Sequence, residues 1–150
     1  CHNLLFLVCF NAFGGLMILF PNIIKRIVEV GGQLQRNLAQ DVRGVLGGKN
    51  NGIDAQALNG MRLVRSTVYE VLRMDPPVPF QYAKAKKDFV VESHDGRYQV
   101  KKGELLAGYQ PMAMRDPHVF EDAQQFTPDR FMCDGAKGQN LLQYLFWSNG

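Results

Sequence analysis

Residues 69–73 read Tyr69-Glu70-Val71-Leu72-Arg73 and place a glutamate and an arginine three positions apart. The apolar residues around them recur at helical spacing, which predicts a helix from about Met61 to Arg73. Side chains at positions i and i+3 share one face of a helix, so Glu70 and Arg73 can form an ion pair there. Asp75-Pro76-Pro77 then stops the helix, because a residue that precedes proline disfavours the helical conformation.

Two environments remain open for this pair on the residues alone. A solvated surface pair would contribute only a few tenths of a kcal/mol. A buried pair would need further partners for the arginine, because the desolvation of an ion is costly. Arg130, within Phe126-Thr127-Pro128-Asp129-Arg130-Phe131, lies among aromatic residues and a proline. It is a candidate third member of a buried network.

The composition is that of a folded domain. The 150 residues are 46% hydrophobic and 21% charged, which excludes an intrinsically disordered chain. The 17 Lys and Arg residues exceed the 14 Asp and Glu residues by only three, and Lys84, Lys86 and Lys87 form their one tight group. Binding to nucleic acid needs a clustered basic face, so no nucleic-acid partner is expected. Three cysteines cannot all pair, which argues against a disulfide scaffold.

The long apolar run from Leu4 to Ile24 allows two interpretations. Its length is sufficient for a transmembrane helix, with Lys25-Arg26 as a charged flank. Asn11, Gly14-Gly15 and Pro21 interrupt the run, and each weakens a helix that faces lipid. A helix that is apolar on all sides is also typical of the central buried helix of a large soluble protein.

The chain is helical first and β-rich later. Amphipathic helical spacing follows Pro21 and is broken at Gly31-Gly32. Short runs typical of strands follow Val78, so the predicted fold class is mainly α with a small β region. The shorter elements predicted are a helix over Ala55–Leu58 capped by Asp54, a hairpin of residues 88–92 and 97–100 around His94-Asp95-Gly96, a strand-like run at 105–107, and short helices at 117–120 and 141–146.

Several motifs, in this order along the chain, resemble a known family. The Glu-x-x-Arg helix, the later Pro-x-Arg-Phe element and the preceding long apolar helix resemble the cytochrome P-450 fold. The narrower resemblance is to the plant hydroperoxide-metabolising branch, which contains allene oxide synthase, hydroperoxide lyase and divinyl ether synthase. The motifs that carry it are Phe10-Asn11-Ala12-Phe13-Gly14-Gly15, Pro76-Pro77-Val78-Pro79, Glu92-Ser93-His94-Asp95, Gly108-Tyr109-Gln110-Pro111 and Trp147-Ser148-Asn149-Gly150.

The resemblance implies that residues 1–150 are one partial cytochrome P-450 domain from the C-terminal half of the fold. This part would run from the central distal helix through the Glu-x-x-Arg helix, the β region and the Pro-x-Arg-Phe segment. The last four residues, Trp147-Ser148-Asn149-Gly150, look like the segment just upstream of the haem-ligand loop. Because the chain starts at Cys1 without an initiator Met and enters apolar sequence at once, we expect an internal fragment of a larger protein.

The resemblance also implies a role for individual residues. Asn11 would be the catalytic amide that binds and orients a substrate hydroperoxide. Three charged residues would form a structural triad that holds the haem-side core, namely Glu70, Arg73 and Arg130. Four apolar residues would line the substrate site, namely Phe10, Phe13, Pro79 and Phe80.

The implied cofactor is haem b, held by an axial cysteine thiolate. In the family this ligand follows the Trp-Ser-Asn-Gly segment, so it would lie beyond Gly150. None of Cys1, Cys9 and Cys133 stands in that motif, and we expect no metal ligand within residues 1–150. The 150 residues alone are therefore expected to be inactive.

The activity implied by the resemblance is that of a haem-thiolate allene oxide synthase. Such a lyase, a hydroperoxide dehydratase, converts polyunsaturated fatty-acid hydroperoxides to allene oxides in oxylipin and jasmonate biosynthesis. Hydroperoxide lyase or divinyl ether synthase activity is the alternative within the branch. An NADPH-dependent haem monooxygenase and a single-span membrane protein are remoter alternatives. The preferred interpretation needs no NADPH, O2 or reductase, allows peripheral membrane association, and implies a plastid location.

One argument about the chemistry does not depend on the resemblance. No Asp, Glu, Ser or Thr occurs between Cys1 and Ile24. Activation of O2 at haem iron requires protons, which acid and alcohol side chains beside the iron normally relay. If this run lines a haem, it suits a substrate that already contains an O–O bond.

Overall fold

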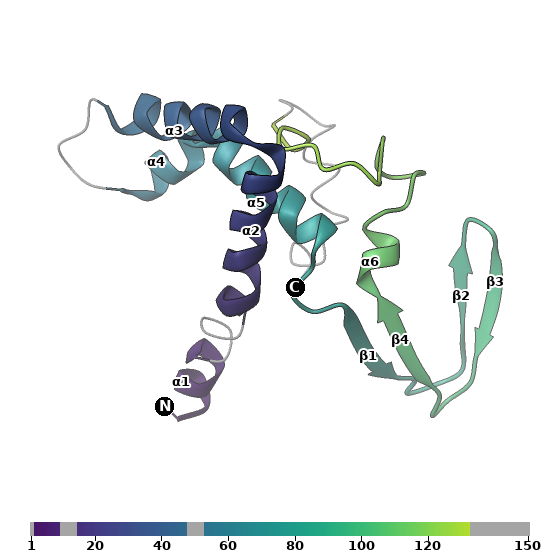
Figure 1. The fold of residues 1–150 in the computed structure, drawn as a ribbon. Coiled ribbons are helices and arrows are strands. Elements are labelled where there is room, and N and C mark those ends of the chain that lie inside the picture. Colours follow the sequence, from purple (N-terminus) through teal and green to yellow (C-terminus); the bar gives the residue numbers. More distant parts are fainter. Residues whose placement is uncertain (1, 10–14, 48–52, 133–150) are drawn as a thin grey trace.

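The computed structural model describes residues 2–9, 15–47 and 53–132. Figure 1 shows a helical part at one side of the molecule and two strand ladders that extend to the other side. The elements in chain order are α1 (His2–Cys9), α2 (Leu16–Val30), α3 (Gly32–Leu46), α4 (Ala55–Gly60), α5 (Arg62–Met74), β1 (Phe80–Lys84), β2 (Phe89–Ser93), β3 (Gly96–Val100), β4 (Leu105–Tyr109) and α6 (Gln110–Ala113). The predicted class, mainly α with a small β region, is confirmed.

The helices α2 and α3 meet at the predicted glycine break. Gly31 has a φ of +98°, a left-handed conformation that strains residues with a side chain. The chain therefore leaves the direction of α2 and begins α3 at Gly32. Both helices pack against α5, which places the Glu-x-x-Arg helix in the middle of the helical part.

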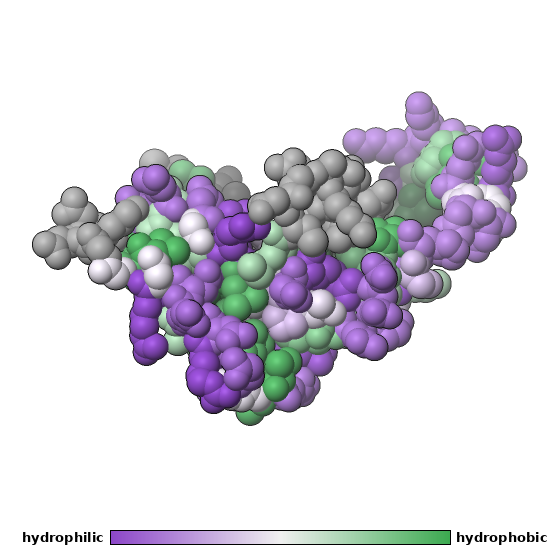
Figure 2. Space-filling view, turned by 90° about the horizontal axis from the view of Figure 1, so that it is seen from above, coloured by the Kyte–Doolittle hydropathy of each residue, from purple (hydrophilic) through white to green (hydrophobic). Residues whose placement is uncertain are grey.

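The apolar run from Leu4 to Ile24 falls into α1 and the first half of α2. Residues 10–14 between these helices lie outside the described part of the chain. Within residues 2–9, 15–47 and 53–132, the helices are all too short or too polar to cross a membrane. Apolar side chains are nevertheless exposed on these two helices, as at Phe6 and Phe20. Figure 2 shows the molecule from above, where apolar patches lie between hydrophilic ones.

Two aspartates cap helix N-termini. The side chain of Asp54 accepts a 2.6 Å hydrogen bond from the backbone N–H of Ala57, as the predicted N-cap of α4. Asp41, in α3, reaches the start of α5 and accepts the N–H groups of Leu63 and Val64 at 2.9 and 3.1 Å. Because Met61 provides no side-chain cap for α5, a carboxylate from another helix satisfies these otherwise unpaired donors.

The β region consists of two antiparallel pairs. The predicted hairpin is confirmed as β2 and β3, in which Ser93 pairs with Gly96 across the turn. The second pair joins β1 to β4, with Phe80 opposite Tyr109, and so brackets the hairpin. At the open end of the hairpin, Asp88 accepts a 2.8 Å hydrogen bond from the backbone N–H of Lys102.

The structure differs from the expected short helix at residues 117–120. This segment is a turn, in which the N–H groups of Val119 and Phe120 both donate to the carbonyl oxygen of Asp116. Phe120 is fully buried there. A short helix, α6, forms earlier instead, and the expected helix at 141–146 lies outside the described residues.

The inter-helix cap gives a first testable prediction. In the full-length protein, Asp41→Ala should lower the free energy of unfolding by about 1–2 kcal/mol, because two N–H donors at the start of α5 lose their acceptor. Denaturant unfolding measures the change. The neighbouring exposed Gln40 on α3 provides the control: Gln40→Ala should change stability by less than about 0.5 kcal/mol. Equal effects of the two substitutions would contradict the capping role.

Candidate functional site

The ion pair of the Glu-x-x-Arg motif is fully buried. The Nε and Nη2 atoms of Arg73 donate to the two carboxylate oxygens of Glu70, each at 2.8 Å. Neither side chain has measurable exposure to solvent. A bidentate contact between a planar guanidinium and a carboxylate is the strongest arrangement for such a pair. The surface alternative for this motif is therefore wrong.

The rest of the Arg73 guanidinium is satisfied by backbone carbonyl oxygens. Its Nη1 atom donates to Met114 at 2.8 Å and to Ala123 at 2.7 Å, and its Nη2 atom donates to Gln125 at 3.0 Å. The guanidinium also lies 5.1 Å from the centre of the buried Phe120 ring. These partners offset the desolvation of the cation and attach the segment after α6 to α5.

Arg130 completes the group from the far end of this segment. Its Nε atom lies 3.2 and 3.1 Å from the two oxygens of Glu70, and its side chain is 8% exposed. The backbone N–H of Thr127 donates to the same carboxylate at 2.9 Å. Arg130 also donates to the carbonyl oxygens of Glu121 and Asp122. The structure thus brings Glu70, Arg73 and Arg130 together around one carboxylate.

One residue of the carbonyl-bearing segment has an uncommon backbone conformation. Asp122 has a φ of +47°, in the left-handed region that Asp tolerates better than most residues. Its own carbonyl oxygen accepts from Arg130, and the next carbonyl, that of Ala123, accepts from Arg73. The turn therefore aims successive carbonyl oxygens at the two arginines.

Sequence reasoning missed a hydroxyl that fastens the same segment. Ser66 is 1% exposed and accepts a 2.9 Å hydrogen bond from the backbone N–H of Phe131, next to Arg130. Its position four residues before Glu70 places it on the same helix face. That spacing was the signal in the sequence that could have identified it.

A second missed contact ties α2 to the end of α5. The guanidinium of Arg26 donates to both oxygens of Asp75, at 2.6 and 2.9 Å, and lies 5.8 Å from the centre of the Phe126 ring. The hydrogen bond to Asp75 raises the pKa of Arg26 above its usual value. Forty-nine residues separate the partners, so no local pattern pointed to the contact.

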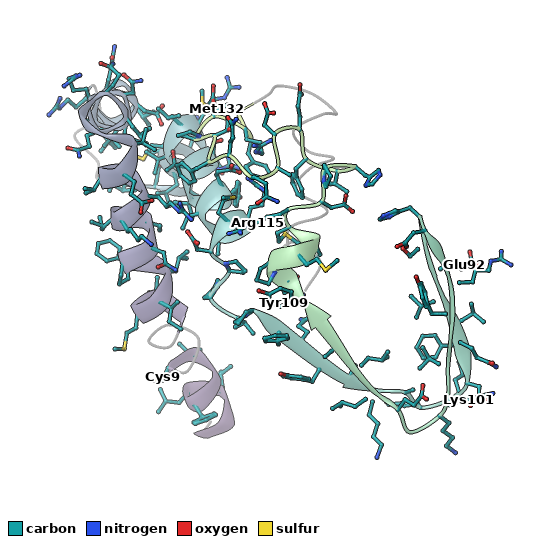
Figure 3. The ribbon with its side chains drawn as sticks, turned by 45° about the vertical axis from the view of Figure 1, so that its right-hand side comes forward. Cys9, Glu92, Lys101, Tyr109, Arg115 and Met132 are labelled. Atoms are coloured by element: carbon teal, nitrogen blue, oxygen red, sulfur yellow. The ribbon has the colours of Figure 1, made fainter. Side chains whose placement is uncertain are left out.

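Pro79 and Phe80 lie where the chain leaves α5 and enters β1. The carbonyl oxygen of Pro79 accepts the N–H of Gln110 at 2.9 Å. The Phe80 ring centre lies 4.9 Å from that of Tyr109 on β4 and 6.0 Å from that of Tyr82. We call Phe80, Tyr82 and Tyr109 the aromatic group; all three side chains are more than 40% exposed. Figure 3 labels Tyr109 at the end of β4.

The other predicted site residues lie elsewhere in the chain. Phe10, Asn11 and Phe13 fall outside the described residues, so the structure leaves their predicted roles untested. Cys9 is a free, exposed thiol on α1. Cys133 also falls outside the described part.

Comparisons with known proteins agree with this geometry. The family model described as cytochrome P450 matches residues 32–150. The chain is 50% identical over 149 residues, 99% of its length, to the chloroplastic allene oxide synthase of Arabidopsis thaliana, and covers 28% of that protein. It is 49% identical to the chloroplastic allene oxide synthase 1 of Oryza sativa, with 99% and 29% coverage. It is 50% identical to a 9-divinyl ether synthase of Capsicum annuum, with 99% and 30% coverage.

A helix with a buried Glu-x-x-Arg pair, joined to a downstream arginine and matched by the family model, defines a haem protein of the cytochrome P450 class. The chain belongs to the cytochrome P450 family. Within it, the similarity is to the plant hydroperoxide-metabolising branch, which holds the allene oxide and divinyl ether synthases named above. The chain spans about three tenths of the length of these curated relatives.

The buried group of Glu70, Arg73 and Arg130, which we call the charge triad, gives a second prediction. In the full-length protein, Glu70→Gln keeps the side-chain size but removes the charge that two arginines share. We expect a loss of about 3–5 kcal/mol, because buried cations remain without compensation. Unfolding by denaturant measures it, together with the haem content of the purified protein.

A matched substitution in an exposed pair provides the control. Glu92 lies 2.9 Å from Arg97, with side chains 63% and 78% exposed. Glu92→Gln should cost less than about 1 kcal/mol, since a solvated pair contributes little. Equal free energies of unfolding for the two variants would contradict the stabilising role of the buried network.

Proposed function

We propose that the full-length protein is an allene oxide synthase, a lyase that dehydrates polyunsaturated fatty-acid hydroperoxides to allene oxides. The observation that carries the proposal is the identity of about 50%, over nearly the whole chain, with allene oxide synthases of several plants. Residues 1–150 form a partial cytochrome P450 domain of this enzyme. A divinyl ether synthase is the second candidate, because a relative with that name is equally similar. Hydroperoxide lyase activity is a third outcome of the same test.

Haem b, when bound, supplies the cleavage of the hydroperoxide O–O bond. The exposed apolar side chains of α2 and the aromatic group would contact the apolar surface of the haem or of the substrate. The described residues offer no thiolate in the family's ligand motif, and Cys9 is exposed on α1. We assign the axial ligand to a cysteine outside residues 1–150, since none of Cys1, Cys9 and Cys133 stands in that motif.

Asn11 is the residue to which we assign the binding and orientation of the hydroperoxide. An amide both donates and accepts hydrogen bonds, so it can hold the peroxide oxygens without transferring a proton. The acid-free and hydroxyl-free sequence from Cys1 to Ile24 supports this chemistry. It also argues against an NADPH-dependent monooxygenase, which must deliver protons to O2.

The apolar wall of the site would be formed by Phe10, Phe13, Pro79 and Phe80. Phe80 is supported in this role by its position, because it is half exposed at the start of β1 and its ring centre lies 4.9 Å from that of Tyr109. Aromatic side chains at this place would hold an acyl chain and exclude water from a radical intermediate. The Arg26–Asp75 contact fixes α2 relative to the chain that leads into Pro79 and Phe80.

The location and partners follow from the same proposal. We infer a plastid location, since several relatives are named as chloroplastic. The product pathway is oxylipin and jasmonate biosynthesis, and the enzyme needs neither reductase nor NADPH nor O2. Peripheral association with a membrane would suit a lipid substrate. Residues 1–150 alone should be inactive, because most of the relatives' length lies outside them.

The activity is tested with the full-length, haem-loaded protein. We expect rapid loss of the conjugated-diene absorbance of linolenic acid 13-hydroperoxide without NADPH, with ketols and a cyclopentenone as products by mass spectrometry. Divinyl ethers as products would instead identify a divinyl ether synthase, and short aldehydes would identify a hydroperoxide lyase. Turnover that requires NADPH would contradict the whole proposal.

The role of Asn11 gives a further prediction. Asn11→Ala should lower kcat/KM for the hydroperoxide on the order of 100-fold, because a misplaced peroxide reacts poorly. Haem content, read from the Soret band, should stay unchanged. Asn37, exposed on α3, provides the matched control, and Asn37→Ala should leave kcat/KM unaltered. A normal rate for Asn11→Ala would remove this residue from the catalytic site.

A further inference from the structure

Two turns that are distant in sequence bring metal-binding side chains together. His94 lies in the turn between β2 and β3, whereas Asp116 and His118 lie in the turn that follows α6. The two imidazole ring centres are 4.5 Å apart, at an interplanar angle of 38°. One potential ligand atom from each of the three residues lies within 4.8 Å of the others. Figure 1 shows the closed end of the hairpin beside the segment after α6.

Asp116 orients His118 within this cluster. Its Oδ1 atom accepts the backbone N–H of His118 at 2.8 Å and also lies 2.8 Å from the ring Nδ1. These two side-chain atoms face each other at nearly the separation of two ligands of one ion, so an ion at this place would be bound by Oδ1 of Asp116 and Nδ1 of His118.

The surroundings of the cluster are open to ions. The three side chains line a groove of about 790 Å³, together with Tyr109 and Arg115. His94 and His118 are exposed, so their rings can rotate to the spacing of roughly 3.3 Å that tetrahedral zinc requires. The Nη2 atom of Arg115 donates to the carbonyl oxygen of Met74 at 2.8 Å, which directs this cation toward α5. Figure 3 labels Arg115 between α5 and α6.

We propose that His94, Asp116 and His118 bind one divalent transition-metal ion of the zinc type. Two imidazoles and one carboxylate are ligands that zinc accepts, with water in the fourth tetrahedral position. Magnesium and calcium prefer sites made of oxygen atoms and are poor candidates here. The proposal rests on these three side chains and does not depend on the haem chemistry proposed above.

A metal ion at this place would be a structural cross-link. The turn with Asp116 and His118 continues into the segment whose carbonyl oxygens, at Ala123 and Gln125, bind Arg73. At its open end the hairpin is fastened through Asp88. Zinc would fasten its closed end to the segment that surrounds the charge triad.

Zinc affinity of the full-length, haem-loaded protein tests the proposal. Competition between the protein and a chromophoric chelator for added zinc chloride gives the affinity of the tightest site. His94→Ala and His118→Ala should each weaken this site at least about tenfold, and Asp116→Asn should weaken it by about 10–100-fold. His2, on α1, provides the matched control, and His2→Ala should leave the affinity unchanged.

The result that overturns the proposal is equal zinc affinity in the wild-type protein and both histidine variants. Because the two histidines are exposed, the variants should fold, and the Soret band and circular dichroism verify this. Hydrogen exchange provides a second readout. Zinc should slow exchange in residues 89–100 of the wild-type protein and not of His94→Ala, whereas identical exchange in both would refute the cross-link.

Discussion

The arrangement of this chain depends on one buried carboxylate that two arginines share. Glu70 receives Arg73 from its own helix and Arg130 from the far end of the segment after α6. One negative charge between two cations leaves a surplus positive charge, which backbone carbonyl oxygens stabilise in this buried environment. The segment between Met114 and Gln125 is therefore constrained by electrostatics as much as by apolar packing.

The helix α5 transmits this constraint to the rest of the molecule. A carboxylate from α3 satisfies its N-terminus, through Asp41, and its C-terminal Asp75 binds Arg26 of α2. The chain then enters Pro79 and Phe80 only a few residues further on. Three polar contacts therefore hold α5 and so position the proposed substrate contact that follows it. They are the Asp41 cap at its start, the charge triad along its length and the Arg26–Asp75 pair at its end.

Features with a local signal could be predicted from the sequence. Spacing and capping chemistry identified α5, the Asp54 cap and the hairpin around His94-Asp95-Gly96, whereas the residues alone left a buried network as one of two alternatives for the Glu70–Arg73 pair. Features that depend on distant partners were missed. Strand β1 is stabilised by β4 on the far side of the hairpin, and Arg26 meets Asp75 across forty-nine positions. The helix predicted at residues 117–120 failed because tertiary burial of Phe120 favours a turn.

The charge triad and the residues proposed to contact the substrate are different sets of side chains. Glu70 and Arg73 are fully buried and Arg130 nearly so, and their polar atoms are satisfied by one another and by backbone groups, as a structural role requires. A fold of this kind hosts several reactions, and the outcome is decided by the side chains that face the reacting atoms. An allene oxide synthase and a divinyl ether synthase are equally similar to this chain. Since the chain is equally similar to both relatives, overall similarity does not separate the two reactions, and the side chains that face the reacting atoms must decide between them.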